Sequence, residues 1–265
     1  MTAPTPADFH RLHHGPAPLL LPNAWDHASA AALAAEGFAA IGTTSLGVAA
    51  AAGLPDGAAA TRDLTLRLAL ALGSGPFALS VDAEGGFSDD PAEVGEFARE
   101  LYAAGAAGIN LEDGLGDTAL HAAKIAAVKA AAPGLFVNAR TDTYWLGDGE
   151  GTRDRLDAYR QAGADGVFVP GPADPDTIAS LVEFLDDDVP LNILYSSAGP
   201  TVDRLGELGV RRVSLGSLLY RRALGAAVQA AVGIRAGRSP QGRTPTYGEV
   251  SAYAPTARQR ARRQS

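Results

Sequence analysis

The sequence contains no cysteine, which excludes disulfide bonds, thiolate metal sites and cysteine nucleophiles. Basic residues are also in the minority: 22 Lys and Arg stand against 30 Asp and Glu, and the net charge of −8 argues against a nucleic acid partner. No apolar run approaches the roughly 18 residues of a membrane helix, and the first residues lack the charged and apolar regions of a signal peptide. We therefore expect a soluble, cytoplasmic protein with no membrane contact.

Aromatic residues are few as well, at 6% of the chain, whereas apolar residues of all kinds make up 46% of its 265 residues. A chain of this size can bury a full core. The abundance of alanine and glycine favours tightly packed layers of helices on strands.

Short apolar segments recur along the chain, and helical patterns separate them. The eight segments are Leu19–Leu21, 39–43, 77–81, 108–111, 135–138, Gly166–Val169, Leu191–Leu194 and 212–215. Helices are predicted from Pro91 onward, over 119–131 and over 153–162, and glycines such as Gly105 and Gly163 mark helix ends. This alternation predicts an α/β fold of the (β/α)₈ TIM-barrel type. An open doubly wound sheet is the alternative, although no Gly-x-Gly-x-x-Gly follows the first segment to support a dinucleotide site.

Carboxylates follow two of these apolar segments directly. Asp82 and Glu84 come after 77–81, and Glu112 and Asp113 come after 108–111. Because strand ends converge on one face of a parallel barrel, we expect these side chains to share a pocket. Like charges raise one another's pKa, and a hard divalent cation relieves that conflict. We interpret Asp82, Glu84 and Glu112 as metal ligands, with helix capping as the alternative for Glu84 and Asp113.

An arginine, Arg140, ends the segment at 135–138 beside Asp142. An unpaired guanidinium there would be unfavourable. Its planar fork suits a substrate carboxylate, and a structural ion pair with one of the acids is the alternative.

The five histidines offer weaker candidates. His10, His13 and His14 precede the first strand and are expected on the surface of a leading helix. His27 and His121 follow strand ends, where they could act as acid or base. A helix-cap or surface role is favoured for both.

Over roughly residues 9–236, the sequence resembles the isocitrate lyase/phosphoenolpyruvate mutase superfamily. Six motifs in this order carry the resemblance: Leu-Pro-Asn-Ala-Trp-Asp (21–26), Thr-Thr-Ser-Leu-Gly-Val (43–48), Gly-Leu-Pro-Asp-Gly (53–57), Val-Asp-Ala-Glu-Gly-Gly (81–86), Asn-Leu-Glu-Asp-Gly (110–114) and Asn-Ala-Arg-Thr-Asp (138–142). Any one of them alone would be weak evidence, but together they are specific.

The resemblance implies a Mg²⁺ site, with Mn²⁺ as a possible substitute, for 2-oxo acids and related carboxylates. It assigns Asp82, Glu84, Glu112 and Asp56 to the metal, partly through water; Thr44, Ser45 and Leu46 to substrate oxygens; Arg140 to the substrate carboxylate or oxo oxygen; and Asp82 and Trp25 to the substrate-binding set.

The resemblance also implies a barrel whose eighth helix is exchanged with a neighbouring subunit, usually in a tetramer built as a dimer of helix-swapped dimers. We accordingly expect a homo-oligomer. Residues 1–240 would form one barrel domain that includes the exchanged helix, and residues 241–265 a C-terminal extension with a solvated, mobile, arginine-rich tail.

Two departures from the superfamily narrow the chemistry. The catalytic cysteine of isocitrate and methylisocitrate lyases, carried in Lys-Lys-Cys-Gly-His, has no counterpart here, which argues against those activities by that mechanism. Phosphoenolpyruvate mutase and phosphonopyruvate hydrolase carry a lysine in the loop that corresponds to residues 113–121, and this loop contains no lysine. Lys124 lies several residues beyond the matching position. Phosphorus–carbon chemistry is thereby disfavoured.

We therefore predict a Mg²⁺-dependent carbon–carbon lyase, acting by decarboxylation or retro-aldol cleavage on a small 2-oxo or 2-hydroxy di- or tricarboxylic acid. Arg140, Thr44 and Glu112 are its predicted catalytic residues, and an enolate-like intermediate is expected. The alternatives are a non-catalytic 2-oxo-acid binding protein, an oxaloacetate hydrolase and a phosphonopyruvate-type enzyme. The proton donor is left open among Tyr144, Tyr195 and His121.

Overall fold

The computed structural model describes residues 5–254, so the arginine-rich end predicted as a mobile tail lies outside the described residues. The strands are β1 (Leu19–Leu21), β2 (Asn23–Ala24), β3 (Ala40–Thr43), β4 (Ala78–Asp82), β5 (Ala106–Glu112), β6 (Phe136–Arg140), β7 (Gly166–Val169), β8 (Leu191–Leu194) and β9 (Arg212–Ser214). The helices are α1 (Pro6–Leu12), α2 (His27–Ala35), α3 (Ser45–Ala52), α4 (Arg62–Leu72), α5 (Pro91–Ala103), α6 (Thr118–Ala131), α7 (Thr143–Leu146), α8 (Thr152–Gln161), α9 (Pro175–Leu185), α10 (Val202–Glu207), α11 (Leu218–Arg235) and α12 (Tyr247–Ala252).

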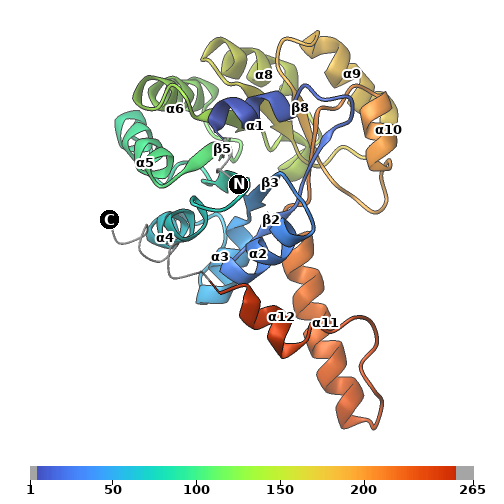
Figure 1. The fold of residues 1–265 in the computed structure, drawn as a ribbon. Helices are drawn as coiled ribbons and strands as arrows, with labels where there is room; N and C mark the ends of the chain where they lie inside the picture. Colours follow the sequence, from blue (N-terminus) through green and yellow to red (C-terminus); the bar gives the residue numbers. More distant parts are fainter. Residues whose placement is uncertain (1–4, 255–265) are drawn as a thin grey trace.

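The strands form one parallel sheet in the order β1-β9-β8-β7-β6-β5-β4-β3-β2, which curls into a nearly closed barrel surrounded by helices (Figure 1). The predicted TIM-type barrel is confirmed, and the open doubly wound sheet is wrong. Each predicted apolar segment coincides with a strand to within a few residues.

The strand predicted at Leu19–Leu21 is β1, and Pro22 separates it from a second short strand, β2. Proline has no N–H to donate to a neighbouring strand, so a continuous ladder cannot pass through it. Before this point the carbonyl of Leu21 accepts from the N–H of Leu215 at 3.1 Å, beyond the end of β9. At Pro22 the carbonyl accepts from Gly42 on β3 at 2.8 Å. The backbone therefore changes partners at the proline, and this change closes the barrel.

Helix boundaries follow local sequence signals. Asp90 caps α5 by accepting the N–H of Ala92 at 2.8 Å, and Pro91 occupies the first turn, where its missing N–H costs nothing. The turn after α5 needs Gly105, whose φ is +98° and where a Cβ would lie 2.5 Å from the carbonyl oxygen of Gly73.

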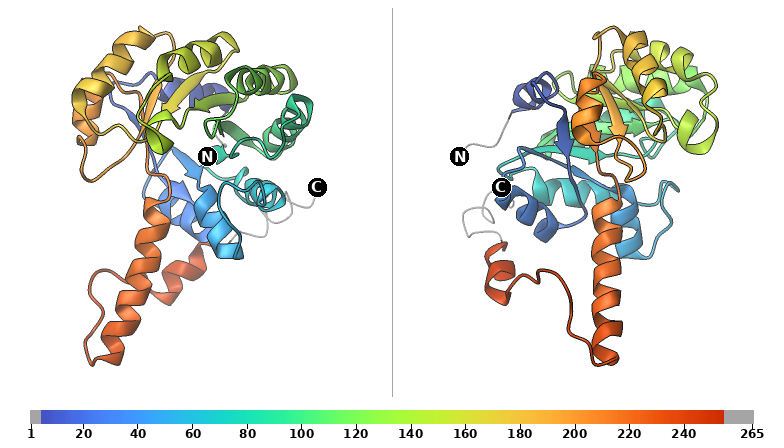
Figure 2. Two further views of the ribbon diagram at one scale, coloured as in Figure 1. Left: turned by 180° about the vertical axis from the view of Figure 1, so that it is seen from behind. Right: turned by 90° about the vertical axis from the view of Figure 1, so that its right-hand side faces the viewer.

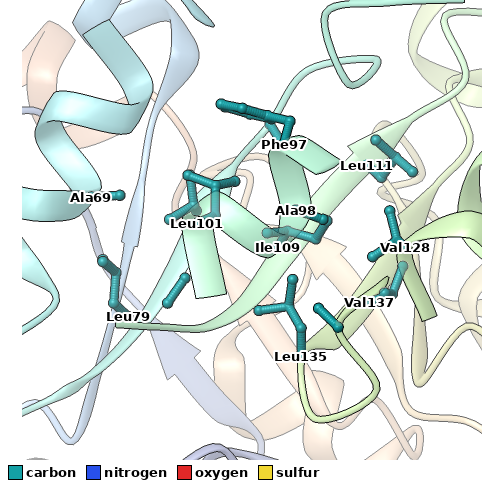
Figure 3. Packing of buried hydrophobic residues seen from close by; sticks show 14 of the residues in the cluster. Ala69, Leu79, Phe97, Ala98, Leu101, Ile109, Leu111, Val128, Leu135 and Val137 are labelled. Carbon is teal, nitrogen blue, oxygen red and sulfur yellow. The ribbon is translucent and has the colours of Figure 1, made fainter. Parts of the chain in front are cut away.

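The largest apolar core lies between the sheet and the helices α5 and α6. Phe97 and Leu101 of α5 pack over Leu79, Ile109 and Val137, which come from three neighbouring strands (Figure 3). Burial of these side chains holds the strands in register and so fixes where their carboxyl ends lie.

The amino-terminal end of the barrel is covered by α1. Phe9 is fully buried and meets Phe136 edge to face. The expectation that His13 lies on the surface is wrong: only 1% of it is exposed, and its ring stacks on Phe136 with 4.3 Å between centroids. The reason is helical spacing, because residue 13 follows Phe9 by four and shares its inward face.

The C-terminal segment leaves the barrel. Helix α11 projects away from it, and α12 returns alongside so that the backbone carbonyl of Tyr253 lies 2.9 Å from Nε2 of His27 on α2 (Figures 1 and 2). The predicted exchange of a helix between subunits stays a prediction. Among residues 5–254, no helix combines the length and apolar character that a bilayer crossing requires, while the compartment stays a prediction.

Candidate active site

A cavity of about 250 Å³, here called the central cavity, lies at the carboxyl ends of the strands. Its lining includes predicted site residues from four different motifs, namely Thr44, Ser45, Leu46, Asp56, Asp82 and Arg140. The strand-end argument from the sequence therefore holds for these residues. The volume is that of a small organic acid together with a few waters.

One wall of the central cavity is the first turn of α3. Thr44 is the N-cap, and the N–H of Ser45 donates to Oδ2 of Asp82 at 3.1 Å. The backbone N–H of Asp82 in turn donates to Oγ1 of Thr43 at 2.8 Å, so the carboxylate is held against this turn. The first N–H groups of a helix have no acceptor within the helix and carry partial positive charge. The turn is therefore suited to receive anionic oxygens.

Arg140 ends β6. In the strand order of the sheet, Asp82 on β4 lies between β6 and the turn that follows β3. Nη1 of Arg140 lies 2.7 Å from Glu112, and its Nε donates to Asp142 at 2.7 Å. The predicted ion-pair alternative is thus present. Arg140 nevertheless lines the central cavity, with 18% of its side chain exposed. It is positioned by two acids and still faces the central cavity.

The predicted metal ligands are divided between two cavities. Asp56 and Asp82 line the central cavity, whereas Glu84 and Glu112 line a neighbouring one of about 390 Å³, here called the side cavity. Glu84 accepts from the hydroxyl of Thr61 at 2.5 Å and from the N–H of Ala59 at 3.2 Å. No cluster of three or more histidines and carboxylates within residues 5–254 is arranged to hold an ion directly.

The backbone at Glu84 is strained, with a φ of +47° in the left-handed region that non-glycine residues rarely adopt. Such a conformation costs on the order of 1 kcal/mol and persists where the surroundings enforce it. Here the bonds from Thr61 and Ala59 hold the carboxylate of Glu84 and favour this conformation.

The acids of both cavities act on one another electrostatically. Burial, and after it the charge of Asp82, raises the pKa of Asp56 and of Glu84, despite hydrogen bonds that lower it, and the charge of Asp56 adds to the rise at Glu84. Burial raises the pKa of Glu112 to about 8, the charges of neighbouring acids add to the rise, and the opposing charge of Arg140 does not offset them. An all-oxygen set of mutually repelling carboxylates fits a hard divalent cation that keeps several of its waters.

Among the predicted proton donors, Tyr195 lines the central cavity. Tyr144 lines a separate depression beside α8. His121 lies in the side cavity, where it is 3% exposed and meets the ring of Tyr159 edge to face, so the predicted surface or cap role for it is wrong. Burial lowers the pKa of His121 to about 4, which keeps it neutral at pH 7.

Trp25, predicted to contact substrate, packs against Tyr220 edge to face. It also lies beneath Gly47, where a Cβ would approach the Cβ of Trp25 to 2.9 Å. The lining of the central cavity does not include it. Its contact with substrate stays a prediction.

Several residues that line the central cavity were not predicted as site residues from the sequence. Asn23, Asn110 and Ser214 line it from strand positions, and Arg221 from the first turns of α11. A polar residue inside an otherwise apolar strand was the available signal for the first three. Arg221 carried no signal, because it sits on a helix whose direction the sequence does not reveal.

Asp113, the next residue after Glu112, is surrounded by hydrogen-bond donors. Asp113 has no exposed side-chain surface and accepts from the Tyr159 hydroxyl at 2.7 Å and from Nη1 of Arg155 at 2.9 Å. The N–H groups of Leu115 and Asp142 donate to its other oxygen at 3.0 and 3.1 Å. Burial raises the pKa of Asp113, but these hydrogen bonds bring it below its ordinary value. Asp113 therefore links the end of β5 to α8. The helix-capping alternative is wrong for both Asp113 and Glu84, because Asp117 caps α6 and Asp90 caps α5.

Known proteins share this fold and much of this sequence. An uncharacterized protein of Mycobacterium tuberculosis is 47% identical over 251 residues, which cover 92% of this chain and 95% of that protein. A 2-methylisocitrate lyase of Bacillus subtilis is 32% identical over 174 residues, or 60% of this chain and 58% of the lyase. A phosphonopyruvate hydrolase solved with oxalate and Mg²⁺ has the same fold, with a TM-score of 0.79 at 24% identity over 100% of this chain and 95% of the hydrolase.

The family model for phosphoenolpyruvate phosphomutase matches residues 9–235, nearly the span over which the motifs carry the resemblance. The match covers the barrel, both cavities and α11. The chain therefore belongs to the phosphoenolpyruvate phosphomutase family, within the isocitrate lyase/phosphoenolpyruvate mutase superfamily of enzymes.

Proposed function

We propose that this enzyme is a metal-dependent carbon–carbon lyase for a small 2-oxo or 2-hydroxy di- or tricarboxylic acid. The observation that carries the proposal is the central cavity, where Arg140 and the first turn of α3 face the carboxylate of Asp82. An anion-binding turn, a cation and a metal-binding acid around one small cavity suit an acid that chelates a metal.

The metal in this proposal is Mg²⁺, with Mn²⁺ as a substitute. Asp82 would hold it most directly, with Glu84, Glu112 and Asp56 contributing in part through water. When bound it would supply Lewis-acid polarisation of the 2-oxo group. The solved phosphonopyruvate hydrolase with oxalate and Mg²⁺ supports this choice of metal.

The side chains of this protein provide the other half of the chemistry. In a 2-oxo acid, the electron pair of the breaking carbon–carbon bond moves toward the 2-oxo oxygen, and the leaving group departs as carbon dioxide or as a carbonyl compound. In a 2-hydroxy acid, the hydroxyl loses its proton, its carbon becomes the carbonyl, and the electron pair leaves with the other fragment, whose own carboxylate accepts it as an enolate. In both cases the oxygen on C2 carries negative charge during the reaction. Arg140 and the N–H groups at Thr44–Leu46 stabilise the negative charge that develops on that oxygen. The remaining fragment then needs a proton on carbon, for which Tyr195 is placed in the cavity wall.

A second cation favours a substrate with a second carboxylate. Arg221 lines the central cavity from α11, is partly open to solvent, and donates from Nε to the Ser217 hydroxyl at 3.2 Å. No acid within residues 5–254 forms an ion pair with it. A distal carboxylate would satisfy this guanidinium, whereas a monocarboxylate would leave it unused.

The environment of Lys124 separates this proposal from phosphorus–carbon chemistry. Its Nζ donates to the carbonyl of Gly85 at 3.1 Å and pairs with Asp89 at 3.3 Å in the side cavity. It is engaged there and is absent from the lining of the central cavity. It does not replace the lysine missing from the loop at 113–121. Oxaloacetate hydrolysis and binding without turnover remain the alternatives that the assay below separates.

We also propose that α11 packs against a second copy of the chain, as in a dimer of helix-swapped dimers. Leu224 and Val228 are each 56% exposed and Val232 is 43% exposed, at a spacing of four residues that makes one apolar stripe. Light scattering should give a mass above that of one chain. Val228→Asp on the stripe should lower this mass, whereas Ala226→Asp on another side of the helix should not. Equal masses for both variants would contradict the proposal.

The catalytic proposal is tested with purified protein, Mg²⁺ and a panel of oxaloacetate and substituted malates, with product identity read by NMR. Carbon–carbon cleavage of at least one acid is expected, and Asp82→Ala should abolish both turnover and metal-dependent binding. Asp63→Ala, at an acid whose side chain is 81% exposed on α4, is the matched control. Tight binding across the panel without turnover would favour the binding protein, and oxalate plus acetate from oxaloacetate would favour the hydrolase.

A further inference from the structure

Arg212 is a cation sealed inside the barrel. It is the first residue of β9, is 1% exposed, and forms no ion pair with any acid of residues 5–254. The ring of Phe9 on α1 lies 5.9 Å from its Cζ and closes the amino-terminal side. Burial lowers the pKa of Arg212 to about 9, while the charge of Asp82 opposes this, so the guanidinium is charged at neutral pH.

The position of Arg212 in the barrel is one layer below the central cavity. It precedes Ser214, which lines the cavity, by two residues on the same strand. On the facing side, Ser80 precedes Asp82 by two residues and receives Nη2 of Arg212 at 3.2 Å. Because alternate residues of a barrel strand point inward in successive layers, Arg212 and Ser80 lie beneath the layer of Ser214 and Asp82.

Arginine fixes the orientation of Asn110 above it. Nη2 of Arg212 lies 3.1 Å from Oδ1 of Asn110, and Asn138 donates to the same oxygen at 2.9 Å. An arginine can only donate, so Asn110 must turn its carbonyl toward Arg212 and its NH₂ away from it. Asn110 also lines the central cavity, which places a hydrogen-bond donor on the cavity side.

The hydroxyl of Ser214 is constrained in the same way. Its Oγ accepts from Nε of Arg212 at 3.3 Å and from Nδ2 of Asn192 at 3.0 Å. Both lone pairs are then occupied, and the hydroxyl hydrogen is what Ser214 can offer elsewhere. The lining of the central cavity thus includes two groups, the Asn110 amide and the Ser214 hydroxyl, whose contacts with Arg212 leave them as hydrogen-bond donors.

We infer that Arg212 is a positioning residue, which holds Asn110 and Ser214 as donors toward an anionic oxygen of the substrate and places a positive charge beneath that oxygen. A buried cation without an acidic partner is unfavourable, and an anion bound in the cavity above would offset this. The inference rests on the proposed function, because it assigns Asn110 and Ser214 to a carboxylate or oxo oxygen of the same acid substrate.

The test is the affinity for oxalate, a small planar dianion, measured by calorimetry in the presence of Mg²⁺. Ser214→Ala and Arg212→Met should each weaken oxalate binding about tenfold. The double variant should bind no more weakly than Arg212→Met alone, because that change has already released Ser214. Ser80→Ala is the matched control: Ser80 bonds to the same guanidinium without lining the cavity, and its loss should leave the affinity within twofold.

The inference would be overturned if the double variant lost oxalate affinity by the product of the two single losses. It would also be overturned if Ser80→Ala and Ser214→Ala weakened oxalate binding equally. If Arg212→Met fails to fold by circular dichroism, the comparison of Ser80→Ala with Ser214→Ala decides alone. Absence of oxalate binding by the wild type would overturn it too. Oxalate binding that depends on Ser214, together with no turnover of any acid, would reject the proposed lyase and leave this inference standing.

Discussion

Glu112 and Asp113 are neighbours in the chain and have opposite environments. Glu112 has one cationic partner, Arg140, which it shares with Asp142, and faces other acids across the side cavity. Asp113 has Arg155, Tyr159 and two backbone N–H groups as partners, and its side chain has no exposed surface. The pKa is raised at the first and lowered at the second.

The difference separates a carboxylate that supports the fold from one that opposes it. Asp113 has its charge fully compensated within the protein, so its ionised form stabilises the folded state. At Glu112, burial and repulsion by other acids oppose ionisation, and an added cation would relieve both. A group whose environment is completed only by something from outside is a candidate for function.

The largest expected effect is on stability at Asp113. Asp113→Asn leaves the partly buried guanidinium of Arg155 without its carboxylate, which should cost about 3 kcal/mol, or roughly 6–12 °C in Tm. Thermal unfolding followed by circular dichroism measures this. A matched Glu112→Gln variant should keep or raise the Tm of the metal-free protein, and a larger fall there than in Asp113→Asn would contradict the contrast.

The same two variants should differ in the other direction in activity. Glu112→Gln removes a carboxylate that supports the metal, and a loss of about 10–100-fold in metal affinity or turnover is expected. Asp113→Asn should retain most of its activity at a temperature where it is folded. Steady-state rates over a Mg²⁺ titration provide the measurement, and equal losses in both variants would show that the two acids form one functional unit.

Mg²⁺ should stabilise the protein through one of these acids and not the other. At 100 times its Kd, a ligand that binds only the folded state adds about 2.7 kcal/mol. We expect the rise in Tm with added Mg²⁺ to shrink in Glu112→Gln and to persist in Asp113→Asn. A titration of Tm against Mg²⁺, with Ca²⁺ and Na⁺ for comparison, checks this, and an undiminished rise in Glu112→Gln would remove Glu112 from the metal site.

The smallest effect is on the pH dependence of stability without metal. Because the pKa of Glu112 is raised, the folded protein binds more protons there than the unfolded chain, and stability falls as pH rises from about 4.5 toward about 8. Because the pKa of Asp113 is lowered, its contribution is present above about 3.8 and is lost as pH falls. Glu112→Gln should flatten the first slope and Asp113→Asn the second, as measured by urea unfolding in EDTA. Unchanged slopes would refute both assignments.

The sequence was sufficient for the barrel and for the strand-end positions of Asp82 and Arg140, because parallel strands bring their carboxyl ends together whatever the details of packing. It placed Glu112 and Asp113 together at the end of one strand. It could not reveal which of them would be neutralised. The partners of Asp113 lie 42 and 46 residues further along the chain, on a helix whose placement depends on packing.

Residues classed by polarity alone were misjudged. His13 and His121 were expected at the surface, yet each is buried against an aromatic ring, Phe136 or Tyr159, that comes from a distant element. The division of the acids between two cavities was equally hidden. It depends on the left-handed backbone at Glu84 and its bonds to the loop before α4, neither of which periodicity records.

The separation of β1 from β2 at Pro22 has a consequence for the time at which the barrel can close. On the β2 side, Asn23 and Ala24 can pair with β3 as soon as residue 43 has been synthesised. On the β1 side, Leu19 cannot pair until Arg212 has been synthesised, because β1 pairs with β9. A growing chain therefore carries the edge of β1 unpaired through most of its synthesis. The seam at Pro22 is where an incomplete barrel stays open longest.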